Sequence, residues 1–307
     1  MIILALGSAA GGGVPQWNCI GRISAAARSG SGDVFARTQS SLAVSADGKR
    51  WVLLNASPDL RQQLAETPAL HPDSDGRLRN SPIAAVVLTN ADVDHIAGLL
   101  TLREGHAFHI YAAARVLDTL AANSVFNVLA PELVQRLPLA LDKQTKLIGP
   151  EGATGLDILP FAVPGKVALF LESRSKPGFG TEVGDTIGLE IRDGHSSFFY
   201  LPACAHVDFY LAERLRGAEL VVFDGTLFAD DEMIAQGLSQ KTGKRMGHIS
   251  MSGPEGSMAA LAGLGIRRRV YIHINNSNPV LREGSRERAE VEAAGWQIAH
   301  DGMEMTL

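Results

Sequence analysis

Short apolar runs recur along the chain, and each ends at a polar or glycine-containing turn. The run Ile83–Leu88 is continuous, which is typical of a strand buried on both faces. The Asp-Gly pairs at 47–48 and 193–194 lie between such runs and predict β-hairpins. The predicted strands are Ile2–Leu6, Leu42–Val44, Trp51–Leu54, Ile83–Leu88, Val167–Leu171, Thr186–Ile191, Phe198–Leu201, Leu220–Phe223 and Val270–Ile274.

Helical patterns lie between these strands. The predicted helices are Pro58–Glu66, Ala112–Leu129, Val207–Arg216, Gly253–Leu264 and Ser285–Ala294. Strands, hairpins and helices therefore mix in both halves of the chain. This mixture favours an α/β fold, in part α+β, in which helices cover both outer faces of packed sheets. We expect residues 1–307 to form a single domain, since there is no internal repeat and Pro68–Arg79 is typical of a surface loop.

The composition narrows the function. With 46% hydrophobic residues and a net charge of −5, the 307-residue chain is typical of a globular protein and lacks the basic excess of a nucleic-acid binder. Its apolar runs reach about six residues, well short of the ~20 that span a bilayer. The apolar start has no Lys or Arg before it, so it predicts a buried strand and not a signal peptide. Two cysteines suit a reducing compartment, and we expect a cytoplasmic protein.

Polar side chains crowd together directly after the strand Ile83–Leu88. Asn90, Asp92 and Asp94 share one face of an extended segment, and His95 follows at the start of a predicted helix. Carboxylates and an imidazole at the end of a buried strand favour a bound cation. The alternative is a helix N-cap, for which Asp and Asn are common.

Two further histidines raise the case for a metal site. His273 lies near the end of the run Val270–Ile274 in "YIHINNSNP", and His248 lies in the glycine-flanked stretch "RMGHISMSG". A lone histidine is more often a core or surface residue than a ligand. Two histidines near the boundaries of strands or helices, in a chain that also contains Asp-x-Asp-His, favour metal ligation.

These motifs resemble those of a known superfamily. Residues 90–95, N-A-D-V-D-H, stand where the metallo-β-lactamase superfamily has His-x-His-x-Asp-His after a strand. Other stretches are similar to the branch of that superfamily that acts in pyrroloquinoline quinone (PQQ) biosynthesis. They are LGSAAGGGVPQWNC, RTQSSLAVS, WVLLNASPDLRQQ, LTNADVDHIAGLLTLREG, VPGKV, VVFDGTLF, GKRMGHISMSG, HINNSNPVL and GWQIAHDGM. The resemblance implies a four-layer αββα sandwich with the metal site at the rim between the sheets.

The chain departs from the superfamily pattern at one of its two metal sites. The resemblance places Asn90, Asp92 and Lys166 where the first site has three histidines, and Ala203 or Cys204 where an aspartate bridges two ions. Lysine is a poor ligand at neutral pH. We therefore expect the first site to be lost and Lys166 to point inward in a catalytic role.

The second site is retained in the sequence as Asp94, His95 and His273. Two imidazoles and one carboxylate form the ligand set of non-heme Fe(II) oxygenases, and a mononuclear zinc site can use the same residue types. The resemblance favours Fe(II) as the metal. Asp92 is either an extra ligand or a hydrogen-bond partner of His95 or of a bound water. The resemblance also places Asp224 and His248 near the reacting centre.

The resemblance implies an anionic substrate, a cross-linked glutamate–tyrosine derived from a peptide. An acidic protein needs a local basic pocket for such a ligand. The candidate substrate-binding residues are Arg37, Asn90, Lys241, Lys244 and Arg245. The alternative for the lysines and Arg245 is a solvated basic loop.

Close relatives have Cys-x-Cys-x-x-Cys after "QWN", a spacing suited to structural zinc. Here only Cys19 remains, because Gly21 and Ser24 replace the other two cysteines. We therefore expect no structural zinc and a lobe held by the packing of Trp17 and Val14. The glycines at 11–13 lack the Gly-Lys-Ser/Thr ending of a phosphate loop, so they predict a close backbone approach to the active site.

Three functions follow as hypotheses. The first is an Fe(II)-dependent oxygenase, using O₂ and an external reductant, that hydroxylates the tyrosine-derived ring of the Glu–Tyr precursor of PQQ. The second is a non-catalytic carrier of PQQ or its precursor. The third is a mononuclear zinc hydrolase. Other enzymes of the pathway and a second copy of the chain are the expected protein partners.

Overall fold

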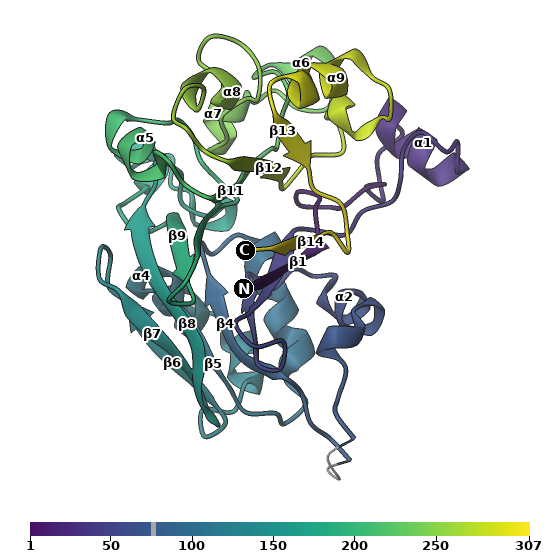
Figure 1. The fold of residues 1–307 in the computed structure, drawn as a ribbon. Coiled ribbons are helices and arrows are strands. Elements are labelled where there is room, and N and C mark those ends of the chain that lie inside the picture. The colour runs from purple at the N-terminus through teal and green to yellow at the C-terminus, as the bar shows by residue number, and fades with distance from the viewer. Residues whose placement is uncertain (75–77) are drawn as a thin grey trace.

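Two seven-stranded β-sheets pack face to face in the computed structural model, which describes residues 1–74 and 78–307 (Figure 1). The first sheet consists, in spatial order, of β14 (Glu304–Thr306), β1 (Ile2–Gly7), β2 (Ser41–Ser45), β3 (Trp51–Leu54), β4 (Ile83–Leu88), β5 (Phe108–Ala113) and β6 (Val134–Leu139). The second consists of β13 (Trp296–Ile298), β12 (Arg268–Ile272), β11 (Leu220–Asp224), β10 (Ser197–Leu201), β9 (Ile187–Arg192), β8 (Gly152–Ala162) and β7 (Thr145–Gly149).

Short helices connect the strands. The α-helices in the described residues are α1 (Arg22–Ser29), α2 (Leu60–Glu66), α3 (Val93–Ile96), α4 (Ala114–Ala122), α5 (Phe209–Leu215), α6 (Glu232–Ala235), α7 (Gly243–Met246), α8 (Ser257–Ala260) and α9 (Arg286–Ala293). The 3₁₀ turns are η1 (Pro68–Leu70), η2 (Ala97–Leu102), η3 (Ser124–Val128), η4 (Leu169–Leu171), η5 (Pro177–Gly180) and η6 (Pro279–Leu281).

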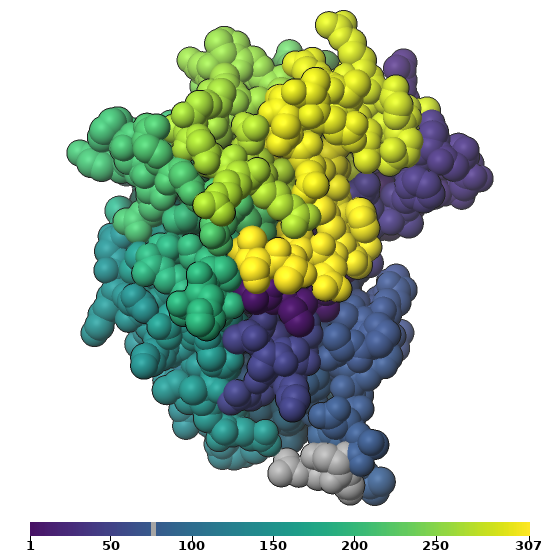
Figure 2. Space-filling model, viewed as in Figure 1, coloured from purple at the N-terminus to yellow at the C-terminus, as the bar shows by residue number. Residues whose placement is uncertain are grey.

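Alternate residues of the strands supply three apolar layers. Ala85 and Val87 of β4 belong to the core between the sheets, whereas Val86 and Leu88 belong to the core under α2 and α4. In the second sheet Tyr271 faces the outer core, beneath α5 and α9. This burial on both faces explains the continuous apolar runs, and the predicted four-layer αββα sandwich is confirmed (Figure 1). The space-filling view shows the yellow C-terminal residues against the purple N-terminal ones, where β1 pairs with β14 (Figure 2).

The direction of the strands determines where polar loops meet. Strands β3 to β6 are parallel to one another, and so are β10 to β13. The antiparallel hairpins β2–β3 and β9–β10 are those predicted from the Asp-Gly turns, and β7 and β8 form a further hairpin. The loops after β4, β11 and β12 then lie at one rim, where an isolated bridge joins Asn90 to Thr186.

Two predicted elements are wrong. The predicted helix Ala112–Leu129 is split, since its first residues pair in β5 with β4 and β6, and α4 starts at Ala114. The predicted strand at Val167–Leu171 is a loop ending in η4, because β8 and β9 pair directly with each other and leave no place for it in the sheet. Residues 75–77 of the predicted surface loop lie outside the described residues.

Candidate metal centre

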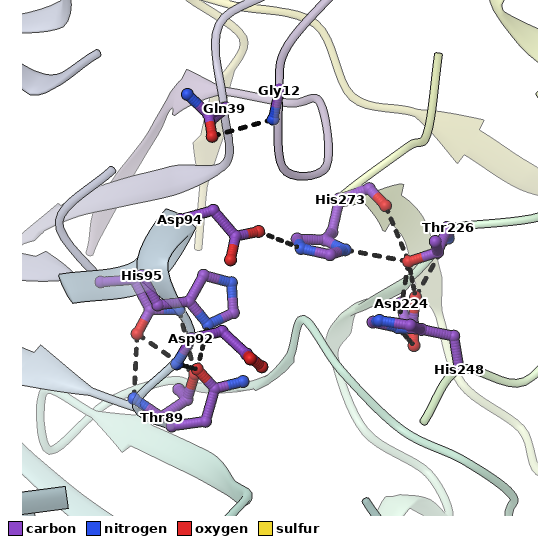
Figure 3. Close-up of polar contacts among 12 residues, drawn as sticks. Gly12, Gln39, Thr89, Asp92, Asp94, His95, Asp224, Thr226, His248 and His273 are labelled. Carbon is purple, nitrogen blue, oxygen red and sulfur yellow. Dashed lines mark hydrogen bonds and ion pairs between the residues drawn. The ribbon is translucent and has the colours of Figure 1, made fainter. Parts of the chain in front are cut away.

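The predicted ligands come from the two sheets and meet at the rim. Asp94 and His95 lie on α3, directly after β4, and His273 directly follows β12 (Figure 3). One ligand atom of each lies within 4.8 Å of those of the other two. Oδ2 of Asp94 is 3.0 Å from Nε2 of His273, and the His95 and His273 ring centroids are 5.3 Å apart. We call Asp94, His95 and His273 the candidate metal centre.

His95 shows how well this centre suits a metal ion. Nδ1 of His95 donates to Oδ1 of Asn90 at 2.7 Å. Nε2 is buried and has no hydrogen-bond partner in the structure. A buried polar atom without a partner is costly, so its free lone pair is suited to a cation. The donor set and this orphaned nitrogen both fit a divalent transition metal.

The charges of the centre agree with this reading. Burial lowers the pKa of His95 against the attraction of Asp94, a direction that favours the neutral ring required of a ligand. Burial would raise the pKa of Asp94, but the His95 and His273 rings hold it well below its usual range. Burial also opposes the charge on His273, yet the Asp94 hydrogen bond and the surrounding carboxylates raise its pKa. A divalent cation here would replace the proton shared by Asp94 and His273.

A second group of titratable residues adjoins the centre through His273. Oδ2 of buried Asp224, at the end of β11, accepts from Nδ1 of His248 at 2.7 Å. The ring of His248 stacks on His273 with centroids 5.2 Å apart. Because Asp224 holds Nδ1 of His248, Nε2 is the atom of this ring that can exchange a proton.

Thr226 joins the two groups and was not predicted. Its Oγ1 is 2.7 Å from Oδ1 of Asp224 and 2.9 Å from Nδ1 of His273 (Figure 3). The hydroxyl thus donates to the carboxylate and accepts from the imidazole, which directs Nε2 of His273 toward Asp94. Its position two residues after Asp224 in "FDGTLF" was the available signal.

The backbone approaches the centre closely, as the glycine run predicted. A Cβ on Gly11 would lie 3.2 Å from Oδ2 of Asp94. His273 has φ 60°, an uncommon value for a residue other than glycine, which marks the turn that leads the chain out of β12.

Asp92 and Lys166 lie beside the centre but outside it. Asp92 belongs to neither group of close ligand atoms among the described residues, and its Oδ1 accepts from the backbone N–H of Leu169 at 3.4 Å. Direct ligation by Asp92 is therefore not supported by this geometry. The aliphatic part of Lys166 lies against Gly247, since a Cβ on Gly247 would come 2.9 Å from Cγ of Lys166. Nζ of Lys166 is 3.6 Å from the carboxylate of Glu172.

The predicted substrate-binding residues have other partners in the structure. Arg245 pairs with Glu172, exposed Lys244 pairs with Glu255, and the Asn90 oxygen is taken by His95. Lys241 is half-buried. The hydrogen bond from Arg245 lowers the pKa of Glu172, and the charge of Lys241 adds a smaller contribution.

Arg37 does not join this basic group. It is 7% exposed and donates to the carbonyl of Ala299 and, at 3.4 Å, to the hydroxyl of Ser8. These contacts hold the chain together and give no support to the predicted role in substrate binding.

The N-terminal lobe differs in part from the expectation. Val14 is buried as predicted, but Trp17 is 85% exposed, so its packing does not hold the lobe. Arg28 of α1 instead donates to the carbonyls of Cys19 and Gln16. The absence of a structural zinc stays a prediction.

Comparison with known proteins places the fold and the site in a family. Residues 50–274 match the β-lactamase superfamily domain. The chain is 52% identical to coenzyme PQQ synthesis protein B of Xanthomonas oryzae pv. oryzae over 100% of both chains, and 54% identical to that of Rhodopseudomonas palustris over 99% of both. The Zn²⁺-bound crystal structure of PqqB from Methylobacterium extorquens has a TM-score of 0.93, 51% identity and full coverage of both chains. A PhnP-family diphosphatase at 22% identity, with a TM-score of 0.68, shares the fold.

The fold and the site define a member of the β-lactamase superfamily, and they indicate a metal-dependent enzyme. Within that superfamily, the chain belongs to the family of coenzyme PQQ synthesis protein B. In the described part of the chain, no helix has the length and apolar character needed to cross a bilayer.

Proposed function

We propose that the chain acts in PQQ biosynthesis as an oxygenase that holds one Fe(II) ion between Asp94, His95 and His273. Its substrate is the cross-linked Glu–Tyr precursor, which it hydroxylates on the tyrosine-derived ring. The observation that carries this proposal is the buried, unpartnered Nε2 of His95 beside the Asp94–His273 contact. Relatives at 52–54% identity bear the name of a PQQ synthesis protein, which supports the pathway.

The residue types support a redox centre. When bound, Fe(II) supplies one-electron chemistry with O₂ and open coordination positions. Inserting one oxygen atom of O₂ into a ring C–H bond and releasing the other as water consumes two electrons and two protons, so an external reductant is required. The described residues contain two groups of two histidines and one carboxylate, Asp94–His95–His273 and Asp224–His248–His273, which share His273. Of these two groups, the candidate metal centre is the one with a buried ligand nitrogen that has no hydrogen-bond partner.

His248 and the basic residues supply the remaining functions. His248 has its Nδ1 on Asp224 and can deliver or accept a proton at Nε2 next to the centre. Lys166, Lys241 and Arg245 form a positive region beside it, which suits a substrate with several carboxylates. The free thiols of Cys19 and Cys204 support the expectation of a cytoplasmic, reducing setting.

Zinc is the competing metal, because the M. extorquens relative is described as Zn²⁺-bound. Zinc at the same residues supports a hydrolase acting on a peptide or ester. The remaining alternative, a carrier of PQQ or its precursor, requires binding but no catalysis.

The test is anaerobic loading with Fe(II), followed by oxygen uptake and mass spectrometry with the cross-linked substrate and a reductant. The oxygenase incorporates one atom of ¹⁸O from labelled O₂ into the product. Turnover with zinc under nitrogen would replace the proposal by the hydrolase, and tight binding without oxygen uptake would replace it by the carrier.

Variants separate metal binding from proton transfer. Asp94→Ala and His273→Ala should lose both metal and hydroxylation. His248→Ala should keep the metal and lower kcat by about 10²–10⁴-fold, the range for a proton-transfer group. His195→Ala, in the exposed turn between β9 and β10, is the matched control and should change neither. Full iron occupancy in His273→Ala would show that the ligand assignment is wrong.

A further inference from the structure

Glu172 is the point at which the basic side chains beside the candidate metal centre converge. Nη1 and Nη2 of Arg245 donate to its two carboxylate oxygens at 3.2 Å and 2.7 Å. Nζ of Lys166 is 3.6 Å from Oε1. The Glu172 side chain is only 12% exposed, so this carboxylate lies largely within the structure. Paired donation from Arg is the geometry with which proteins recognise a ligand carboxylate.

The Lys166–Glu172 contact lies between the two halves of the site. The Lys166 carbonyl accepts from the hydroxyl of Thr186. Thr186 forms an isolated β-bridge with Asn90, the residue whose side chain holds His95. On the other side, the Lys166 stem lies against Gly247, the residue before His248. Lys166 therefore borders both the metal-ligand side and the proton-transfer side.

The apolar residues directly before Glu172 are largely exposed, whereas Val167 and Ala168, earlier in the same segment, are buried. Leu169, Phe170 and Leu171 of η4 are 59%, 48% and 42% exposed, so they contribute little buried area. Arg245 also covers the Phe179 ring, with its guanidinium carbon 3.7 Å from the ring centroid. The side chain of Arg245 thus holds the segment at Glu172 and at Phe179.

We propose that Lys166 and Arg245 form a carboxylate subsite of the candidate metal centre, and that Glu172 occupies this subsite until a carboxylate of the substrate replaces it. The exchange conserves charge, since one carboxylate leaves the two cations as another arrives. Lys166 and Arg245 keep a carboxylate partner throughout the exchange, so it avoids the cost of leaving a partly buried charge unpaired. The inference rests on the proposed function for the identity of the substrate, and on the structure for the subsite.

This exchange sets the specificity of the site. A ligand without a carboxylate leaves Glu172 in place, and the exposed apolar side chains of η4 then stay at their present position. A ligand with a carboxylate releases Glu172 and gains the paired donors of Arg245. The centre thereby selects polycarboxylates over uncharged aromatic compounds of similar size.

The test measures binding to the metal-loaded protein without oxygen, by calorimetry. The probes are benzene-1,3,5-tricarboxylate, which has the required charge, and 1,3,5-trihydroxybenzene, which lacks it. Glu172→Gln removes the internal competitor and should tighten tricarboxylate binding by about fivefold or more, with no change for the uncharged ring. The matched control is Glu255→Gln, which frees exposed Lys244 in the same basic region and should leave both affinities unchanged.

The double variant Glu172→Gln with Arg245→Met should lose the gain. The proposal would be overturned if Glu172→Gln bound the tricarboxylate no more tightly than wild type. It would also be overturned if the tighter binding persisted in the double variant. Should Glu172→Gln fail to fold, Glu172→Asp weakens the same contact and allows the same comparison. These binding measurements need no turnover. If the oxygenase assay failed while Glu172→Gln bound the tricarboxylate more tightly, the proposed function would be wrong and the proposed subsite would stand.

Discussion

Oδ1 of Asn90 accepts a hydrogen bond from Nδ1 of His95 at 2.7 Å and a second from the backbone N–H of Asp92 at 3.0 Å. A backbone N–H can only donate, so the atom that it contacts is the amide oxygen. Nδ1 of His95 therefore carries the proton, and the buried Nε2 keeps its lone pair. Asn90 thus orients the ring of His95, one of the proposed ligands.

Removing this acceptor should weaken metal binding. Asn90→Leu keeps the size of the side chain but leaves Nδ1 of His95 without a partner, so Fe(II) or Zn²⁺ affinity should fall by about 10–100-fold. Asn90→Asp retains an acceptor and should stay close to wild type. Competition with a chelator measures both affinities. Equal affinity for Asn90→Leu and wild type would show that Asn90 does not orient the ligand.

Thr226 should matter for both stability and metal affinity. In Thr226→Val the Asp224 carboxylate loses one donor and Nδ1 of His273 loses its acceptor, both in a buried site. We expect a loss of about 1–3 kcal/mol in the free energy of unfolding and weaker metal binding. Thr226→Ser keeps the hydroxyl and should restore most of both. Urea denaturation and chelator competition provide the readouts; an unchanged metal affinity in the valine variant would contradict the link.

Crowding the centre from the backbone should affect the metal and not the fold. The added methyl group of Gly11→Ala would lie 3.2 Å from Oδ2 of Asp94, so the carboxylate must shift. Metal affinity should drop by about tenfold, while the free energy of unfolding changes by less than about 1 kcal/mol. Gly21→Ala is the matched control, because its Cβ would also lie 3.2 Å from a side-chain atom, Sγ of Cys19. Similar metal affinities in the two variants would count against the close approach.

Glu232 of α6 should make the stability of the protein depend on pH. Its carboxyl group accepts from Ser277 at 2.6 Å and from the backbone N–H of Phe228 at 2.8 Å, and burial raises its pKa from 4.5 to about 7. Between these values the folded protein binds more protons than the unfolded chain. The free energy of unfolding should therefore fall as the pH rises through this interval, and then level off.

Glu232→Gln should remove this dependence, which amounts to about 3 kcal/mol between pH 4.5 and pH 7. Urea denaturation at several pH values measures it. Glu104→Gln, in which an exposed side chain changes, is the control and should keep the wild-type profile. A wild-type profile in Glu232→Gln would show that this carboxyl group is not the source.

Local patterns allowed most strands of the site to be predicted. Ile83–Leu88 has the continuous apolar character of a strand buried on both faces, and the polar residues after it mark its carboxyl end. The Asp-Gly turns likewise predicted their hairpins. The predicted helix Ala112–Leu129 was wrong at its start, because a short apolar run fits the periodicity of a strand as well as that of a helix. Pairing of β5 with β4 and β6 makes Ala112 and Ala113 part of a strand.

The sequence alone determined the residue types and the order of the motifs, and its resemblance to the superfamily predicted the loss of the first metal site. Only the tertiary structure decided which groups meet: Asp94 and His273 are 179 positions apart and in contact, Thr226 joins His273 to Asp224, and the predicted clamp Arg245 already holds Glu172. Strand and turn patterns depend on neighbours within a few residues, so they are visible in the sequence. The centre depends on the packing of two sheets, which brings the ends of their parallel strands to one rim.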